Sequence, residues 1–235
     1  MISALETRDL HAWYGESRVL HGLDIVVRPH EVVALLGRNG AGRTTLLRAV
    51  MGLTDKRAGS IRVNGTETIG LPTHRIARLG LGYCPEERGI FASLTCEENL
   101  LLPPRLAGPV SEMGPEEIYS LFPNLAERRH SRGTTLSGGE QQMLAVARIL
   151  RTGASLLLLD EISEGLAPVI VQALANMISL LRRKGYTILM VEQNFRFAAG
   201  LADRFYVIEH GRVVDHFTAG ELDKRAPTLS ALLGV

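Results

Sequence analysis

The chain has few cysteines, few aromatic residues and no long apolar run. Its 235 residues include two cysteines, one tryptophan and 5% aromatic residues in all. Cys84 and Cys96 are too few for a disulfide scaffold and lack metal-site spacing, so we expect a reducing compartment. No apolar stretch approaches the roughly 20 residues of a membrane-spanning helix, and the N-terminus lacks the regions of a signal peptide. We therefore expect a chain that reaches a membrane only by docking on other proteins.

The chain also lacks an excess of either charge. Its formal net charge is +1, from 26 basic and 25 acidic residues. Basic clusters at 74–78, 128–132 and 182–184 fall on different predicted elements, so they do not form the stripe of a nucleic-acid-binding protein. The seven histidines are scattered without ligand spacing. A chain of this size can bury a large core, most simply as one α/β domain with a helical insertion.

A glycine-rich segment is the first positive signal. Residues 37–45 read Gly-Arg-Asn-Gly-Ala-Gly-Arg-Thr-Thr. This fits the phosphate-binding loop, which is glycine, four residues, glycine, lysine and then serine or threonine, except that Arg43 stands at the lysine position. The apolar stretch 31–36 before it predicts a strand, and 46–51 after it predicts a helix closed by Gly52. Taken alone, the segment also fits a glycine-rich turn that binds no ligand.

The loop has a physical reason to bind phosphate. Its glycines let successive backbone N–H groups converge on an anion, and the next helix adds its dipole. Thr44 offers a hydroxyl to Mg²⁺. Arg43 keeps the positive charge but replaces a compact ammonium with a planar fork, and the two are not interchangeable where geometry is tight. The predicted nucleotide-binding residues here are Gly37, Arg38, Asn39, Gly40, Ala41, Gly42, Arg43, Thr44 and Thr45.

Two acids follow a second apolar strand. Residues 155–161 read Ser-Leu-Leu-Leu-Leu-Asp-Glu, which predicts a parallel strand buried on both faces. Because sites in open α/β sheets lie outside the carboxyl ends of such strands, Asp160 is placed to hold Mg²⁺. Glu161 is placed to orient and polarise a water that attacks the γ-phosphate. A strand that ends in acids is unspecific by itself.

A third segment precedes a helix. Residues 136–142 read Leu-Ser-Gly-Gly-Glu-Gln-Gln, ahead of the helical stretch 143–150. Ser137 and Glu140 satisfy a helix capping box, which is a purely structural explanation. A cap does not call for two glycines in the first turn, where they weaken the helix. They do fit a phosphate that approaches exposed N–H groups.

The rest of the chain predicts a mixed fold. Residues 1–30 and 59–70 alternate apolar and polar positions, and the Asn-Gly pair at 64–65 predicts a hairpin in a small antiparallel sheet. Residues 103–150 are helical and punctuated by prolines. A helix with one apolar stripe is predicted from Pro168 to the stop at Gly185, followed by a strand over 186–192.

At the three motifs the chain resembles the ATP-binding subunits of ABC transporters, over essentially its whole length. Segment 37–45 is similar to the Walker A loop, 136–141 to the family signature and 156–161 to the Walker B strand. The resemblance implies a single domain, 1–235, with a P-loop NTPase (RecA-like) core over 1–86 and 152–235. This core has a mostly parallel sheet and a small antiparallel β-subdomain, and an α-helical subdomain is inserted at 87–151.

The resemblance also implies how nucleotide is shared between subunits. Two chains would sandwich two ATP molecules, each closing its signature on ATP held by the other. Segment 163–166 would meet the partner subunit. The residues that would contact the partner's ATP are Ser137, Gly138, Gly139 and Gln141.

Three single positions gain roles from the resemblance. Tyr14 would stack on adenine, although a core tyrosine, or Trp13 in the same role, is an alternative. Glu86 replaces the usual metal-sensing glutamine and can still contact Mg²⁺ or its water. Gln193 replaces the usual switch histidine, so it can hydrogen-bond the γ-phosphate but cannot carry a proton. Ile90–Phe91 fits either core packing or a contact with a membrane subunit.

Segments 88–91, 94–99, 163–168 and 191–194 resemble one of the two ATP-binding proteins of branched-chain amino acid importers. This similarity implies ATP and Mg²⁺ as cofactors and a peripheral position on the cytoplasmic face of the inner membrane. The implied partners are a second, related but different ATP-binding subunit, two permease subunits and, indirectly, a periplasmic solute-binding protein. No nucleic acid is implied.

The function expected is ATP hydrolysis that energises an importer for branched-chain amino acids or related small solutes. One alternative is a subunit that binds ATP without hydrolysing it, because Arg43 alters the loop. Another is an ABC ATPase outside transport. Against that alternative, 45–136 sustains no heptads and the chain is too short for two such domains.

Overall fold

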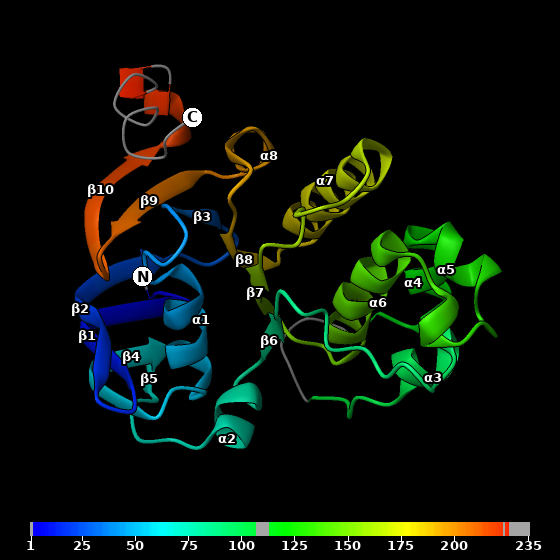
Figure 1. Ribbon diagram of the computed structural model, residues 1–235, viewed down its shortest axis with the longest axis horizontal. Coiled ribbons are helices and arrows are strands. Elements are labelled where there is room, and N and C mark those ends of the chain that lie inside the picture. Colours follow the sequence, from blue (N-terminus) through cyan, green and yellow to red (C-terminus); the bar gives the residue numbers. More distant parts are fainter. Residues whose placement is uncertain (1, 107–112, 223, 226–235) are drawn as a thin grey trace.

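The computed structural model describes residues 2–106, 113–222 and 224–225 (Figure 1). A six-stranded sheet forms its centre, with the strand order β10-β9-β3-β8-β7-β6. All neighbours in it run parallel except β10, which is antiparallel to β9. The strands are β3 (Val32–Leu36), β6 (Leu81–Cys84), β7 (Leu156–Asp160), β8 (Thr187–Val191), β9 (Arg204–Glu209) and β10 (Arg212–Thr218). The strands predicted near 31–36, 155–160 and 186–192 are confirmed.

A smaller antiparallel sheet lies beside the first. Its strand order is β2-β1-β4-β5, and its strands are β1 (Leu5–Tyr14), β2 (Ser17–Val27), β4 (Lys56–Val63) and β5 (Thr66–Glu67). The predicted hairpin joins β4 to β5. Asn64 and Gly65 both have positive φ, 49° and 80°, as a two-residue hairpin of this type requires.

The central sheet is covered on both faces because its strands alternate between two cores. Val33, Leu35 and Leu158 belong to the core shared with α1 (Arg43–Met51) and the antiparallel sheet. Ala34, Leu157 and Leu159 belong to the core shared with α6 (Gly138–Arg151) and α7 (Pro168–Arg183). Continuous apolar strands are typical of parallel sheets buried in this way.

The remaining helices gather mostly on one side of the molecule, around α6 (Figure 1). They are α3 (Cys96–Leu101), α4 (Pro115–Leu121), α5 (Pro123–Glu127) and the short η1 (Gly133–Thr135). Elsewhere lie α2 (Thr73–Ala77), α8 (Phe195–Ala199) and η2 (Ala219–Glu221). Among the described residues, no helix has both the length and the apolar character needed to span a membrane.

The helical region predicted over 103–150 begins earlier in the structure than the sequence pattern indicates. Helix α3 begins at Cys96, before the predicted start at Pro103, because Thr95 and Glu98 form a capping box. The proposed division at residues 87 and 151 stays a prediction, and residues 107–112 lie outside the described part of the chain.

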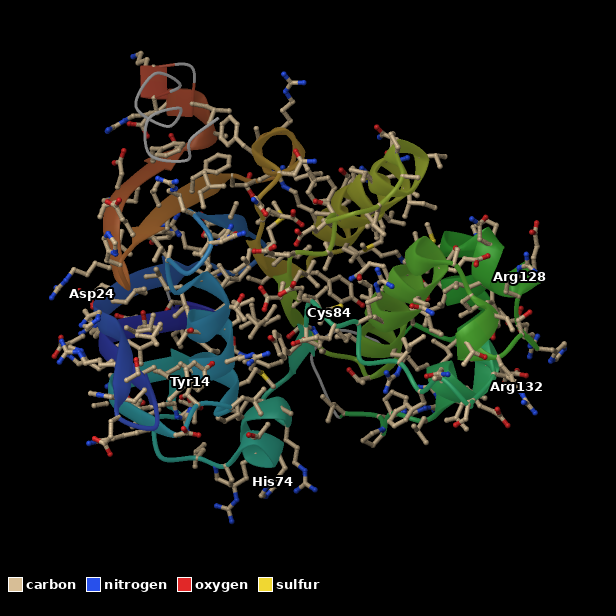
Figure 2. All side chains as sticks on the ribbon, viewed as in Figure 1. Tyr14, Asp24, His74, Cys84, Arg128 and Arg132 are labelled. Carbon is tan, nitrogen blue, oxygen red and sulfur yellow. The ribbon has the colours of Figure 1, made fainter. Side chains whose placement is uncertain are left out.

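Two of the basic clusters noted in the sequence lie far apart. Figure 2 shows His74 below the core and Arg128 and Arg132 at the edge of the helical side. Arg128 and Arg129 pair with acids, Glu140 and Glu97 respectively. The two clusters therefore lie on separate surfaces, and in the second one Arg128 and Arg129 belong to local ion pairs.

The buried sheet yields a prediction for stability. Leu158→Ala removes a fully buried side chain from a central strand, so we expect the free energy of unfolding to fall by about 2–5 kcal/mol. Urea denaturation of the full chain measures this. Val169→Ala is the control because Val169 is 73% exposed. Equal effects of the two substitutions would contradict the described packing.

Candidate functional site

Two strands of the central sheet, β3 and β7, lead to one cavity of about 470 Å³, and β8 lies between them in the sheet. Strand β3 leads into the glycine-rich loop, and β7 ends at Asp160, which Glu161 directly follows. Strand β8 ends next to Glu192. The cavity is lined by Val19, Asn39, Gly40, Ala41, Gly42, Arg43, Thr44, Thr45, Glu86, Glu161 and Glu164. The structure therefore brings together most of the loop, two of the predicted metal contacts (Thr44 and Glu86) and the predicted base.

Backbone geometry at the loop explains two of its glycines. A Cβ at Gly37 would lie 2.3 Å from the Ile208 carbonyl oxygen. Gly42 caps α1 with φ 106°, in the left-handed region. The first backbone bond of α1 runs from the Leu46 N–H to the Gly42 carbonyl. The N–H groups before it have no partner within the helix and are suited to bind an anion.

The side chains predicted to contact the metal present oxygen ligands from different segments of the chain. The Thr44 hydroxyl donates to Asp160 Oδ1 at 3.0 Å, and the Tyr83 hydroxyl donates to Asp160 Oδ2 at 3.0 Å. Burial raises the pKa of the fully buried Asp160, against the effect of these two hydrogen bonds. The Glu86 carboxylate lines the same cavity. One hydroxyl and two carboxylates fit Mg²⁺, which keeps several of its waters.

Arg43 is buried and bridges three segments. Its side chain is 4% exposed. Nη2 donates to Glu161 Oε1 at 2.8 Å and to Asn39 Oδ1 at 3.2 Å, and Nη1 donates to the Glu192 carbonyl oxygen at 3.0 Å. An ammonium group could not span these acceptors in one plane. The arginine therefore holds the predicted base as well as lining the phosphate cavity.

Glu161 lies in an environment suited to a base. It has φ 48°, which is uncommon for a residue with a Cβ. Burial first, and then the nearby Glu164 carboxyl, raise the pKa of its carboxyl to about 7, against the opposing effect of Arg43. A base with a pKa near the working pH is efficient in proton transfer.

Sequence reasoning missed Glu192. Its side chain is 1% exposed, and its Oε2 accepts a hydrogen bond from the Ser163 hydroxyl at 2.6 Å. Burial raises the pKa of Glu192 to about 7. The available signal was a charged residue placed directly at the end of an apolar, fully buried strand.

Several predicted site residues lie outside this cavity. Tyr14 and Gln193 are not among its lining residues. The signature residues lie at the start of α6, across the sheet from α1 (Figure 1). The Gln141 side-chain amide donates hydrogen bonds to the Gly133 and Leu136 carbonyls, and its oxygen accepts one from Arg88. The roles given to these residues remain predictions.

The structure adds packing reasons for the signature. Ser137 and Glu140 form the expected capping box. A Cβ at Gly139 would lie 2.8 Å from Ile170 Cγ1. The glycine therefore allows α6 to approach the first turn of α7, whether or not phosphate binds there.

Comparison with known proteins identifies the class. A family model described as ABC transporter matches residues 20–164. The high-affinity branched-chain amino acid transport ATP-binding protein BraG of Pseudomonas aeruginosa is 44% identical over 94% of this chain and 96% of its own. The chain belongs to the ABC transporter family of ATP-binding proteins, a class of ATPases.

Further relatives differ in what they transport. The probable branched-chain amino acid transport ATP-binding protein LivF of Archaeoglobus fulgidus is 36% identical over 93% of both chains. The lipopolysaccharide export system ATP-binding protein LptB of Escherichia coli is 32% identical over 94% of this chain and 93% of its own. Membership of the transporter family is therefore clear, and the solute is a separate question.

Solved structures confirm the fold class. An ABC transporter ATP-binding cassette in its ADP conformation superposes with a TM-score of 0.82 at 21% identity, over 100% of this chain and 98% of its own. The ATP-binding subunit of an ABC transporter gives 0.81 at 27% identity, over 99% and 100%. The expected P-loop cassette is confirmed, with its mostly parallel sheet, small antiparallel sheet and helices.

The buried Glu192 yields a prediction for stability against pH. Its pKa is about 7 in the folded chain and 4.5 ordinarily, so the folded state binds the proton more tightly. Stability is then lost as pH rises from about 4.5 to about 7. Glu192→Gln removes this loss, so it should stabilise the nucleotide-free chain by about 3 kcal/mol at most at pH 8, and little at pH 5.

Urea denaturation at the two pH values measures the difference. Glu221→Gln is the control because Glu221 is exposed and its pKa is lowered by backbone and side-chain bonds from Thr218. Its substitution should not stabilise the chain at pH 8. A Glu192→Gln effect equal at both pH values would contradict a raised pKa.

Proposed function

We propose that this chain binds and hydrolyses ATP to energise an ABC importer for branched-chain amino acids or related small solutes. One observation carries this: the loop, the Thr44–Asp160 contact and Glu161 meet at a single cavity. The relatives BraG and LivF, named for branched-chain amino acid transport, support the solute class. As a transporter subunit, the chain would act on the cytoplasmic face of the inner membrane.

The residues divide the work at the phosphates. The free N–H groups of the loop and the start of α1 bind phosphate oxygens. Thr44, Asp160 and Glu86 would hold Mg²⁺, which supplies neutralisation of the phosphate charge when bound. Glu161 orients the attacking water and accepts its proton. Arg43 keeps the Glu161 carboxylate in place and adds positive charge beside the phosphates.

The signature residues act on a second nucleotide in this proposal. Ser137 is exposed at the start of α6 and lies away from the cavity of its own chain. This placement supports closure of Ser137 to Gln141 on ATP held by a second, related ATP-binding subunit. Exposed Gln193 would then reach the γ-phosphate when the subunits close, and Tyr14 would stack on adenine.

A groove of about 720 Å³ supports docking on a permease subunit. Its apolar lining includes Met51, Leu53 and Ile149, and Arg148 lines it as well. The Arg148 guanidinium lies 4.9 Å from the centre of the 46% exposed Phe91 ring. We assign the groove to a helix of one of two permease subunits, which receive solute from a periplasmic binding protein. Ile90, in contrast, packs against the core.

A second candidate function is ATP binding without hydrolysis. The pairing of Arg43 with Glu161 favours it, because a base held by a guanidinium is less free to accept a proton. Asp160 and Glu161 are both in position, however, so we place hydrolysis first. Lipopolysaccharide export, suggested by LptB, has the weaker sequence similarity.

The ATPase assay decides between the two. The reconstituted transporter with its cognate subunits is expected to hydrolyse ATP measurably, and Glu161→Gln should remove the activity. Arg43→Lys should raise turnover about tenfold or more, because the Arg43 donors are engaged by the chain, whereas an ammonium can bond the phosphates, and one charge-assisted bond is worth roughly 1.5–3 kcal/mol. Wild-type activity equal to that of Glu161→Gln would leave the binding-only function.

The groove assignment has its own test. Leu53→Asp places a charge in the groove, so co-purification with the permease subunits should fall about tenfold or more. Nucleotide affinity, measured by calorimetry, should not change. Val169→Asp is the matched exposed control. Retention of the permeases by Leu53→Asp would place docking elsewhere.

A further inference from the structure

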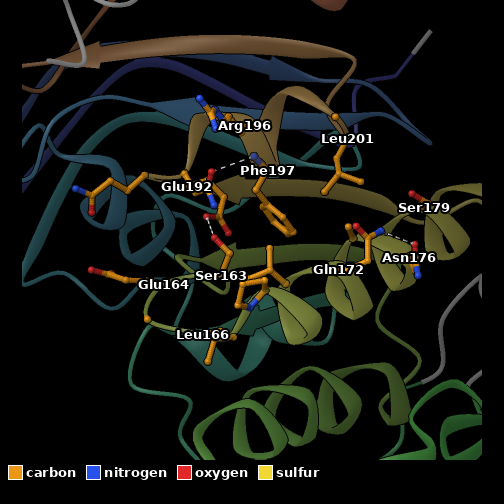
Figure 3. Close-up of a pocket in the computed structure, with 17 residues that line it drawn as sticks. Ser163, Glu164, Leu166, Gln172, Asn176, Ser179, Glu192, Arg196, Phe197 and Leu201 are labelled. Atoms are coloured by element: carbon orange, nitrogen blue, oxygen red, sulfur yellow. Dashed lines mark hydrogen bonds between the residues drawn. The ribbon is translucent and has the colours of Figure 1, made fainter. Parts of the chain in front are cut away.

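Glu192 connects two segments of the nucleotide site (Figure 3). Its side chain accepts the Ser163 hydroxyl bond at 2.6 Å, and its backbone carbonyl accepts from Arg43 Nη1 at 3.0 Å. It directly precedes Gln193. One residue at the end of β8 therefore contacts both the loop after β7 and the arginine at the start of α1.

Burying the Glu192 carboxyl costs free energy, and the cost depends on its charge and its hydrogen-bond partners. Among the described residues its Oε1 has no hydrogen-bond partner and no solvent contact. An ionised carboxylate with one partner would be strongly destabilising there, whereas a neutral carboxylic acid is tolerated more easily. An apolar residue would avoid the cost but could not accept the Ser163 hydroxyl bond.

Ser163 lies in the middle of the loop that carries the base. The Glu161 N–H donates to the Val191 carbonyl at 2.9 Å, which fixes the start of the loop to β8. Ser163 is 5% exposed, and beyond it Glu164 and Gly165 are exposed. The Ser163 bond to Glu192 is thus a second attachment to the same strand end, two residues after the base.

We propose that Glu192 is a positioning residue that holds the loop 161–166 against the end of β8 through Ser163. The loop then presents Glu161 to the phosphate cavity on one side and exposed residues to a second subunit on the other. The effect on turnover rests on the proposed ATPase function, whereas the ordering of the loop does not.

Hydrogen exchange of the nucleotide-free full chain tests the ordering directly. Glu192→Ala and Ser163→Ala should each speed amide exchange in peptides covering 161–166 by about fivefold to tenfold, because each removes the same bond. Glu192→Gln and Ser163→Thr keep an acceptor and a donor, so exchange should stay near that of the wild type. Gln172→Ala is the control, because it breaks an exposed hydrogen bond to Asn176 in the pocket of Figure 3, which Ser163 and Glu192 also line.

Turnover in the assembled transporter tests the consequence. Glu192→Ala and Ser163→Ala should lower kcat by about fivefold to thirtyfold with little change in KM for ATP, and the double variant should be no worse than the worse single one. Glu192→Gln should recover most of the loss. Additive losses, or Glu192→Gln as impaired as Glu192→Ala, would overturn the positioning role.

The two measurements separate the possible failures. An inactive wild type with the expected exchange pattern would reject the ATPase function and keep the loop attachment. Unchanged exchange in Glu192→Ala and Ser163→Ala would reject the attachment, whatever the turnover.

Discussion

A buried guanidinium among carboxyl groups is the interaction on which this site depends. Arg43 contacts Glu161 directly, and Glu86 and Glu164 line the same cavity. Burial raises the pKa of Asp160, Glu161 and Glu192, because desolvation disfavours the ionised form, and the neighbouring carboxyl groups add to each shift. ATP would add further negative charge. The site therefore requires cations, which are Arg43 from the chain and, in our proposal, Mg²⁺ from solution.

The sheet explains why these acids meet at all. Strands β3, β8 and β7 are adjacent and parallel, so their carboxyl ends form one edge. Both faces of these strands are buried, which fixes their register, since a slip by one residue would exchange the two cores. Asp160 lies opposite Val191 in that register. The positions of Glu161 and Glu192 follow from it.

The sequence could predict the parts of the site that are local. The loop at 37–45 and the acids at 160–161 are short motifs whose glycine content and strand ends carry their own physical reason. The hydrogen bond from Arg43 to Glu161 joins residues 118 positions apart in the sequence, and that from Ser163 to Glu192 joins residues 29 positions apart. Both depend on which strands are neighbours, and a single sequence does not state this. The early start of α3 was different, because its capping residue, Thr95, was visible in the sequence.

The contacts of Arg43 change the interpretation of an arginine at the lysine position. A lysine at this position would offer one ammonium, and its charge would go either to phosphate or to a carboxylate. The Arg43 fork donates to Asn39, Glu161 and the Glu192 carbonyl, so it ties the loop, the base and the end of β8 into one unit. Removing one member of a buried pair leaves an uncompensated charge, at a cost of about 3–5 kcal/mol. The departure from lysine thus acts on how the base is held as well as on how phosphate is bound.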